Sequence, residues 1–409
     1  MKLSILKIIL LSALGVVSAS AEDYSFGGDV RARSVYSAYP SSDIFGIPIS
    51  DSTENYLLQG RLNFAIREDN VEFVAEGFGG FQHQSGRARA PGFELGSVVG
   101  DRTALFDLQR ESDGIGSDFY GRVDRLSLGW RNEDTTIKFG RMALTWGQGM
   151  TFQVLDIVNP FPPATIDPEY KPGSDMIYLS NNLRAETRIE FAVVPRRDIE
   201  SHAIEAAEST FALRWVERLE ASESEVQITA AQHYDKALFG LGYNVPIRGA
   251  IARADILVHE KLNGGADFSF IANIDRSWEL FDRNWYGSLE YFHSGVGGSS
   301  NEFAEFSPEL TASLSRGDLF TVGTDYVSFG CRQEVTPLFN FYQLWIQGLN
   351  PVGSLFQLKG TYDLTEDWLL IAAGTFGFGD SDSEFQGIQQ NGTLIERGDS
   401  VFVQIGWYF

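Results

Sequence analysis

The fold class is decided by the stretch Tyr56-Leu57-Leu58-Gln59-Gly60-Arg61-Leu62-Asn63-Phe64-Ala65-Ile66-Arg67. Its even positions are apolar or glycine, whereas most of its odd positions are polar. Such alternation over about ten residues is typical of a tilted strand that faces lipid on one side and water on the other. The pattern recurs over 267–275 and 356–363. A soluble β-sandwich also alternates, so the strands alone leave two fold classes open.

The connections between the expected strands separate these two classes. Long connections cover 38–54, 84–118, 148–173, 296–315 and 379–399, and tight polar turns cover 67–70, 132–134, 181–184 and 364–367. All the long connections fall at one end of the expected barrel, which suits short periplasmic turns and long outer loops but not a Greek-key sandwich. The sequence therefore predicts an all-β, transmembrane, antiparallel up-and-down β-barrel of about 18 strands.

The number of strands is open in one region. Pro246 interrupts the region 236–262, which could lose a hairpin and leave about 16 strands. The expected strands outside that region include 135–147 and 316–329.

The two ends of the sequence predict export and barrel assembly. Lys2 and Lys7, an apolar stretch over 3–17 and the small residues Ala19-Ser20-Ala21 predict a cleaved signal peptide at 1–21. Residues 22–409 are then one barrel domain. The last stretch, 401–409, alternates with an apolar set that ends in Trp407 and Phe409. It resembles the terminal aromatic strand of bacterial outer-membrane proteins, which implies that these two aromatics are an assembly signal for the barrel-assembly machinery.

Charge and residue usage exclude several function classes. A formal net charge of -23 argues against nucleic acid as a partner, because the phosphate backbone would be repelled. The single cysteine, Cys331, excludes a disulfide framework or a thiolate cluster within one chain. The five histidines are scattered, and none lies in a recognisable triad motif. We therefore expect no catalytic residues, no metal site and no cofactor.

The most distinctive stretch is Gly140-Arg141-Met142-Ala143-Leu144-Thr145-Trp146-Gly147-Gln148-Gly149, which runs on to Val158-Asn159-Pro160-Phe161-Pro162-Pro163. Its glycine-arginine, tryptophan-glycine and asparagine-proline pairs resemble a motif of porin-like barrels of the alginate-export type and their uncharacterised relatives. The resemblance implies a channel and identifies no solute.

The connection 148–173 is a candidate constriction loop. Its prolines stiffen it, because each fixes one backbone angle. A stiff loop that folds inward would narrow the pore, and a rigid cap on the outer rim is the alternative. The candidate residues are Asp156, Pro160, Pro162, Pro163, Asp167, Glu169 and Lys171.

Alternation also places charged residues on the water side of the strands. The first half of the chain is expected to present Arg31, Arg33, Arg61, Arg125, Lys138, Arg188 and Arg214 to the lumen. The second half is expected to present Asp255, Asp267, Glu290 and Asp325. Walls of opposite sign would set up a transverse field that tunes ion selectivity. Alternatively, these side chains pair across strands to satisfy a wet lumen.

These features together predict a porin-like channel for small hydrophilic solutes or ions in the outer membrane of a Gram-negative bacterium. Its expected partners are outer-membrane lipid and lipopolysaccharide, the barrel-assembly machinery and the solute, with a periplasmic partner left open. The alternative is a plugged or partner-docked barrel that serves secretion, surface polysaccharide or an electron conduit, because another chain can fill a lumen of this size.

Overall fold

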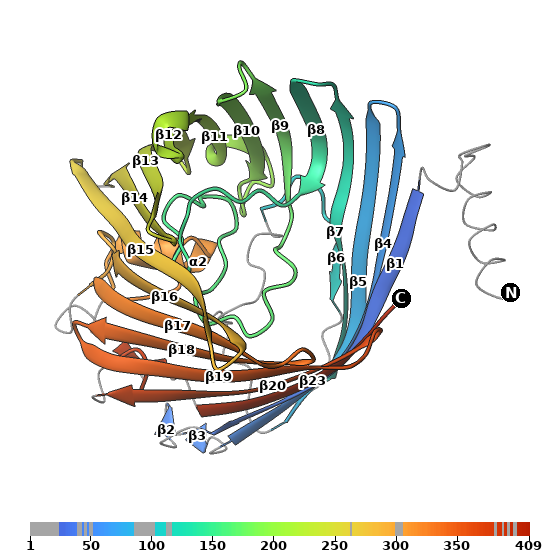
Figure 1. Cartoon of the computed structure of the whole chain (residues 1–409), viewed down its shortest axis with the longest axis vertical. Helices are drawn as coiled ribbons and strands as arrows, with labels where there is room; N and C mark the ends of the chain where they lie inside the picture. Colours follow the sequence, from blue (N-terminus) through green and yellow to red (C-terminus); the bar gives the residue numbers. More distant parts are fainter. Residues whose placement is uncertain are drawn as a thin grey trace, which may run out of the picture.

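The computed structural model describes residues 24–38, 43–44, 47–48, 52–85, 103–111, 117–261, 264–298, 306–379, 383–386, 388–390, 393–395 and 399–409. Within them, one 19-stranded antiparallel sheet closes on itself, because β1 pairs with both β4 and β23. The three-residue β6 is an addition to this sheet, so 18 strands form the barrel wall. Figure 1 shows the strands as a closed ring around an inner segment of chain.

The wall strands are β1 (Tyr24–Ala38), β4 (Ser52–Glu68), β5 (Val71–Ser85), β7 (Ser117–Arg131), β8 (Thr135–Met142), β9 (Ser174–Asn182), β10 (Thr187–Arg197), β11 (Ile204–Leu219), β12 (Ser224–His233), β13 (Lys236–Ile247), β14 (Ala250–Glu260), β15 (Ala266–Leu280), β16 (Arg283–His293), β17 (Asp325–Thr336), β18 (Phe339–Leu349), β19 (Val352–Thr365), β20 (Trp368–Gly379) and β23 (Asp399–Tyr408). Short elements lie in the connections: β2 (Asp43–Ile44), β3 (Ile47–Pro48), β6 (Gln109–Glu111), η2 (Glu220–Ser222), α2 (Pro308–Arg316), β21 (Ile388–Gln390) and β22 (Thr393–Ile395). Among the residues described, no helix is long and apolar enough to cross a membrane.

The outside of the barrel is apolar and its inside is polar. On β4, Leu58 and Leu62 are each 55% exposed, whereas Arg61 beside them is 4% exposed. The same inversion holds along β8, where Ile137 and Phe139 are exposed and Lys138 between them is partly buried. A continuous apolar surface of this kind is costly in water, so its natural surroundings are the hydrocarbon of a bilayer.

The structure confirms the predicted barrel and its strand number. The region 236–262 keeps both of its strands, since β13 and β14 pair from Leu238 and His259 to Ile247 and Ala250. Sixteen strands are thereby excluded. The long connections also lie at one end of the barrel, as expected, because every wall strand is antiparallel to its neighbours.

Two predicted strands are shorter than expected. The expected strand 316–329 begins only at Asp325, and α2 precedes it. Ser307 caps this helix by accepting a hydrogen bond from the backbone of Leu310, and Gly317, at φ 74°, ends it. The expected strand 135–147 ends at Met142, where the chain turns into the barrel.

Because β8 and β9 are short, the barrel wall has a gap in its strands between β7 and β10. Residues 103–111 cover this gap: β6 pairs with β7, and Ala104 forms a bridge with Arg196 of β10. The backbone of Phe106 donates to Asp175 at 2.8 Å and accepts from Arg141 at 2.8 Å. Arg141 and Asp175 are themselves a buried ion pair, so the added segment is fixed to the wall below it.

The predicted signal peptide at 1–21 lies outside the described residues. Its cleavage, and the boundary of the barrel domain at residue 22, stay predictions.

Candidate functional site in the barrel lumen

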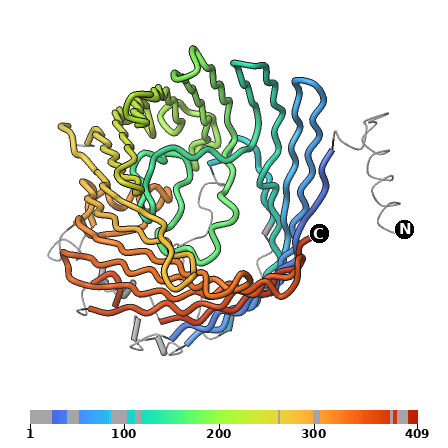
Figure 2. The backbone as a smooth tube through the Cα atoms, in the orientation of Figure 1, coloured from blue at the N-terminus to red at the C-terminus, as the bar shows by residue number. Residues whose placement is uncertain are grey.

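The connection between β8 and β9, residues 143–173, runs inside the barrel and is called here the inner segment. Figure 2 shows it as a green loop enclosed by the strands. Much of it is buried, including Trp146, Phe152, Leu155 and Val158, each at 2% exposure or less. The apolar residues pack against inward side chains of the wall such as Ile271, Phe292 and Tyr326.

The first part of the inner segment contacts strands on the far side of the barrel. The backbone of Gln148 donates to Asp255 on β14, and the backbones of Met150, Thr151 and Phe152 donate to Glu290 on β16. Ser328 on β17 donates to the Thr151 hydroxyl at 2.8 Å.

The middle of the inner segment continues along the wall. Gln357 and Lys359, both on β19, donate to the carbonyls of Ala164 and Ile166 at 2.9 and 3.0 Å. Gln404 on β23 donates to Asp167 at 2.8 Å.

Arg31 on β1 then binds the inner segment through two carboxylates. It donates to Asp167 at 2.7 Å and also pairs with Glu169. Tyr408 on β23 contributes a further hydrogen bond to Glu169, at 3.3 Å.

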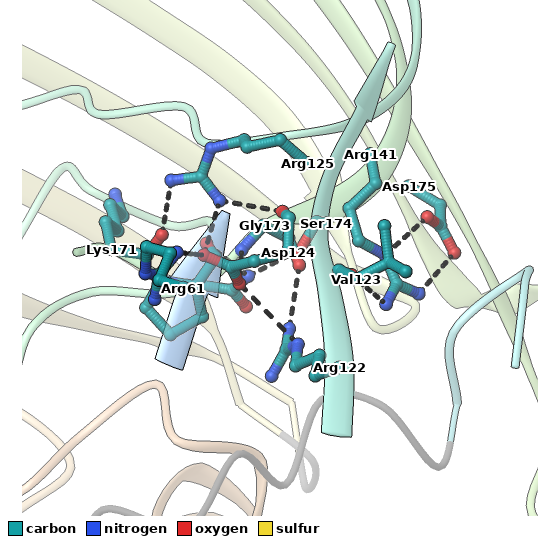
Figure 3. Close-up of polar contacts among 12 residues, drawn as sticks. Arg61, Arg122, Val123, Asp124, Arg125, Arg141, Lys171, Gly173, Ser174 and Asp175 are labelled. Carbon is teal, nitrogen blue, oxygen red and sulfur yellow. Dashed lines mark hydrogen bonds and ion pairs between the residues drawn. The ribbon is translucent and has the colours of Figure 1, made fainter. Parts of the chain in front are cut away.

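The last part returns along β4 and β7. The Arg61 guanidinium lies 3.6 Å from the centre of the Tyr170 ring. Arg125 donates to the carbonyl of Lys171 at 2.5 Å, and Arg122 donates to that of Gly173 at 3.1 Å. Figure 3 shows these arginines around Asp124. The inner segment is therefore held against β14 to β19, then β23, β1, β4 and β7, and it lies within the lumen rather than on the outer rim.

A β-bulge makes the last of these contacts available. Between Glu76 and Gly77 of β5, the pairing register skips Asp124 on β7. The extra residue breaks the alternation, so the side chains of Arg122, Asp124 and Arg125 all reach the inner segment. Alternation of inward and outward residues predicted only Arg125 of this strand to face the lumen. Arg122 and Asp124 could have been found only from the break in that alternation.

Asp156 and Lys171 form a buried pair within the inner segment. Their charged atoms lie 2.5 Å apart, and the Lys171 ammonium also donates to the Leu144 carbonyl and the Thr145 hydroxyl. Burial raises the pKa of Asp156 to about 6 against the opposing effect of Lys171, and burial lowers the pKa of Lys171. Both side chains are inside the segment rather than at its surface.

The other predicted residues of the constriction loop differ in exposure. Pro160 is buried, while Pro162 and Pro163 are partly buried. The side chain of Asp167 is 10% exposed and that of Glu169 is 41% exposed. Glu169 therefore remains the acid of this loop that is most open to solvent.

The cations predicted for the lumen each have a carboxylate nearby. Arg31 pairs with Asp29, Arg33 lies 3.9 Å from Asp167, Arg61 and Arg125 pair with Asp124, Lys138 with Glu72, and Arg188 and Arg214 with Glu190. Their charges are thus balanced within a few ångströms, by carboxylates of the same strand, of other strands or of the inner segment. The role of these cations in selectivity stays a prediction.

The predicted acids have different roles. Asp255 and Glu290 are 0% and 1% exposed and accept from the inner segment. Asp267 pairs with Lys261 at 2.7 Å. The prediction that Asp325 faces the lumen is wrong. The adjacent Tyr326 is buried in the lumen cluster, so alternation places Asp325 on the outer face, where it accepts from Tyr291 and contacts His293.

The predicted assembly residues lie side by side on the last strand. The rings of Trp407 and Phe409 are 5.0 Å apart, and both side chains are about two fifths exposed, at 40% and 41%. The backbone of Phe409 exchanges two hydrogen bonds with Gly28 of β1, each 3.0 Å long.

Comparisons with known proteins identify the fold. No family model matches the chain, and no curated protein sequence matches it. The chain is similar in structure to a BenF-like porin from Pseudomonas fluorescens Pf-5, at TM-score 0.56 and 10% identity, over 95% of this chain and 99% of that one. Acinetobacter baumannii OccAB2 is similar at TM-score 0.58 and 10% identity, over 96% of this chain and 99% of that one. Pseudomonas aeruginosa OccK2 (OpdF) in complex with glucuronate is similar at TM-score 0.52 and 12% identity, over 96% of this chain and 99% of that one. Identities this low establish a shared barrel fold.

Proposed function

We propose that this protein is a porin-like channel of a Gram-negative outer membrane, through which small hydrophilic solutes or ions diffuse. The observation that carries the proposal is the inner segment, which is held inside a closed 18-stranded barrel by wall residues from many strands. Barrels of 16 to 18 strands enclose an aqueous lumen, and a fixed inner loop narrows that lumen. The similarity in fold to porins and the apolar exterior support the same function.

The polar wall of the lumen favours hydrophilic solutes. Paired arginines and carboxylates lie on the inside of β1, β4 and β7. Beside them, the partly exposed side chains of Arg33 and Glu169 offer a donor and an acceptor to a passing molecule. One similar porin was solved with glucuronate, a small charged sugar acid. We propose transport rather than catalysis, and leave the chemical identity of the solute open within the small hydrophilic class.

We further propose that the inner segment sets the narrowest part of the pore. The charge most open to solvent on it is Glu169, whereas Asp156 and Lys171 support it from within. The partners proposed for the chain are outer-membrane lipid and lipopolysaccharide on the apolar exterior and the barrel-assembly machinery at β23.

A swelling assay tests this function. Liposomes that contain the refolded protein are placed in solutions of neutral sugars of increasing size. We expect swelling with monosaccharides that slows as the sugar grows, because passage through a fixed constriction depends on solute size. Liposomes that do not swell faster than protein-free liposomes in any sugar would contradict the proposal.

The alternative function is a barrel plugged by its own loops or docked to a periplasmic partner. One observation favours it: residues 306–324 of a second connection contact the turn between β12 and β13. Arg316 of α2 lies 3.9 Å from the Tyr234 ring beyond β12, and Asp318 lies 3.3 Å from His233. A silent barrel in the swelling assay would favour this alternative.

A further inference from the structure

The turn from Gly147 to Phe152 directs four backbone N–H groups at two carboxylates of the wall. Gln148 donates to Asp255 at 2.7 Å. Met150 donates to one oxygen of Glu290 at 2.7 Å, and Thr151 and Phe152 donate to its other oxygen at 2.9 and 2.8 Å. Backbone N–H groups that converge in this way form a nest, which binds anions. Here the bound anion is a side chain of the protein's own wall.

Two glycines allow the turn to close around the carboxylates. Gly147 has a φ of 88°, a conformation that side chains disfavour. A Cβ on Gly149 would lie 1.6 Å from the carbonyl oxygen of Phe152, so only glycine fits there. The tryptophan-glycine-glutamine-glycine motif of the sequence thus builds the nest.

The surroundings of Glu290 keep its carboxylate out of direct contact with ions in the pore. Its side chain is buried, and Asn273 adds a fourth N–H at 2.9 Å. In the described part of the chain, every hydrogen-bond partner of Glu290 is an N–H donor, either of the nest or of Asn273. Both oxygens of this carboxylate are thus occupied by donors, so the geometry suits holding the turn rather than binding an ion.

We propose that Glu290 is the positioning residue of the lumen constriction and acts by filling the nest of the inner segment. This inference rests on the channel function proposed above. Asp255, which accepts from one backbone group of the same turn, supports the same position.

Replacement of Glu290 should empty the nest. E290A removes the carboxylate but leaves the donors, so a small free carboxylate such as formate has the chemistry to occupy the space. E290Q keeps an acceptor for Thr151 and Phe152 but places an amide NH₂ group near the N–H of Met150. We therefore expect a full effect from E290A, reversed by formate, and a partial effect from E290Q.

Hydrogen–deuterium exchange of the detergent-folded protein measures this directly. We expect faster exchange over 148–155 in E290A, a smaller increase in E290Q, and a return toward the wild-type rate when formate replaces chloride. The matched control is D267N, which removes a carboxylate of the neighbouring strand β15 that pairs with Lys261. Exchange in both Glu290 variants equal to wild type, or a formate effect no larger than in D267N, would overturn the proposal. If E290A does not fold, the exchange rate of E290Q over 148–155 decides: a rate above wild type supports the proposal, and a rate equal to wild type overturns it.

Bilayer recording separates a positioning role from a charge role. Loss of positioning raises the conductance of E290A, and formate lowers it again. Loss of a selecting charge would instead shift the reversal potential at unchanged conductance, which contradicts the proposal. A wild-type protein that forms no channel would refute the proposed function, while the exchange result would still decide the role of Glu290.

Discussion

Arg31 illustrates how charges are used inside this barrel. Its guanidinium donates to Asp29 at 2.6 Å and to Asp167 at 2.7 Å, pairs with Glu169, and lies 4.9 Å from the Tyr170 ring. One wall cation thereby binds three acids, two of them on the inner segment. Removal of any one acid changes a cluster rather than an isolated charge, so selectivity depends on which members remain open to solvent.

Neutralisation of Glu169 should alter ion selectivity. E169Q removes a negative charge whose side chain is 41% exposed in the lumen, so we expect the reversal potential in a salt gradient to shift toward anion selectivity. The control is E200Q, which removes the same charge from the exposed turn between β10 and β11. Equal reversal potentials in E169Q, E200Q and wild type would show that Glu169 does not face the ion path.

Removal of Lys171 should destabilise the protein. K171M leaves the Asp156 carboxylate buried without its cation, which costs about 3–5 kcal/mol. Urea unfolding followed by tryptophan fluorescence measures the loss, and the double variant D156N/K171M should recover part of it. Full stability of K171M alone would contradict the pairing.

The same variant should show a pH dependence. Burial raises the pKa of Asp156 in the folded state above its unfolded value, to about 6. A group with a raised pKa favours folding when protonated and loses that contribution as the pH rises through the folded value. K171M removes the cation that opposes this shift, so the pKa of Asp156 rises further in the variant. The deficit of K171M relative to wild type should therefore be largest at high pH and shrink as the pH falls toward about 6. A deficit that grows on acidification would contradict this assignment.

At the scale of elements, β23 closes the barrel against β1 and places its aromatics outside. F409A removes a ring that contacts Trp407 at a tilt while leaving the backbone bonds to Gly28 in place. We expect less folded protein in the outer membrane and unchanged export to the periplasm, as measured by cell fractionation. Normal outer-membrane levels of F409A would remove the assembly role from this residue.

The wall strands were predictable because the alternation of apolar and polar residues is a local property of the chain. The placing of all the long connections at one end was predictable because it follows from the number of strands between them. The inward fold of 148–173 was also predictable in part, because its prolines favour a stiff loop. The partners of the inner segment were not predictable, because Glu290, Gln357 and Arg31 meet it only after the barrel closes. The bulge at Asp124 and the helix α2 were missed since each interrupts the pattern on which the strand prediction depends.

At the scale of the whole molecule, closure of the sheet predicts resistance to SDS. β1 pairs with β23, so the 18-stranded wall leaves no free edge strand at which unfolding can begin. We expect the unboiled protein to migrate differently from the boiled protein on SDS gels. Identical migration, together with solubility in water without detergent, would contradict a membrane-spanning barrel.

The central claim, a channel narrowed by the inner segment, is tested most directly by single-channel recording of wild type and a shortened variant. Met142 and Ser174 are paired neighbours, so an Asn-Gly turn in place of residues 143–173 can join β8 to β9. The account predicts discrete conductance steps for wild type and larger steps for the shortened barrel. Absence of steps in wild type, or steps of equal size in both proteins, would contradict it.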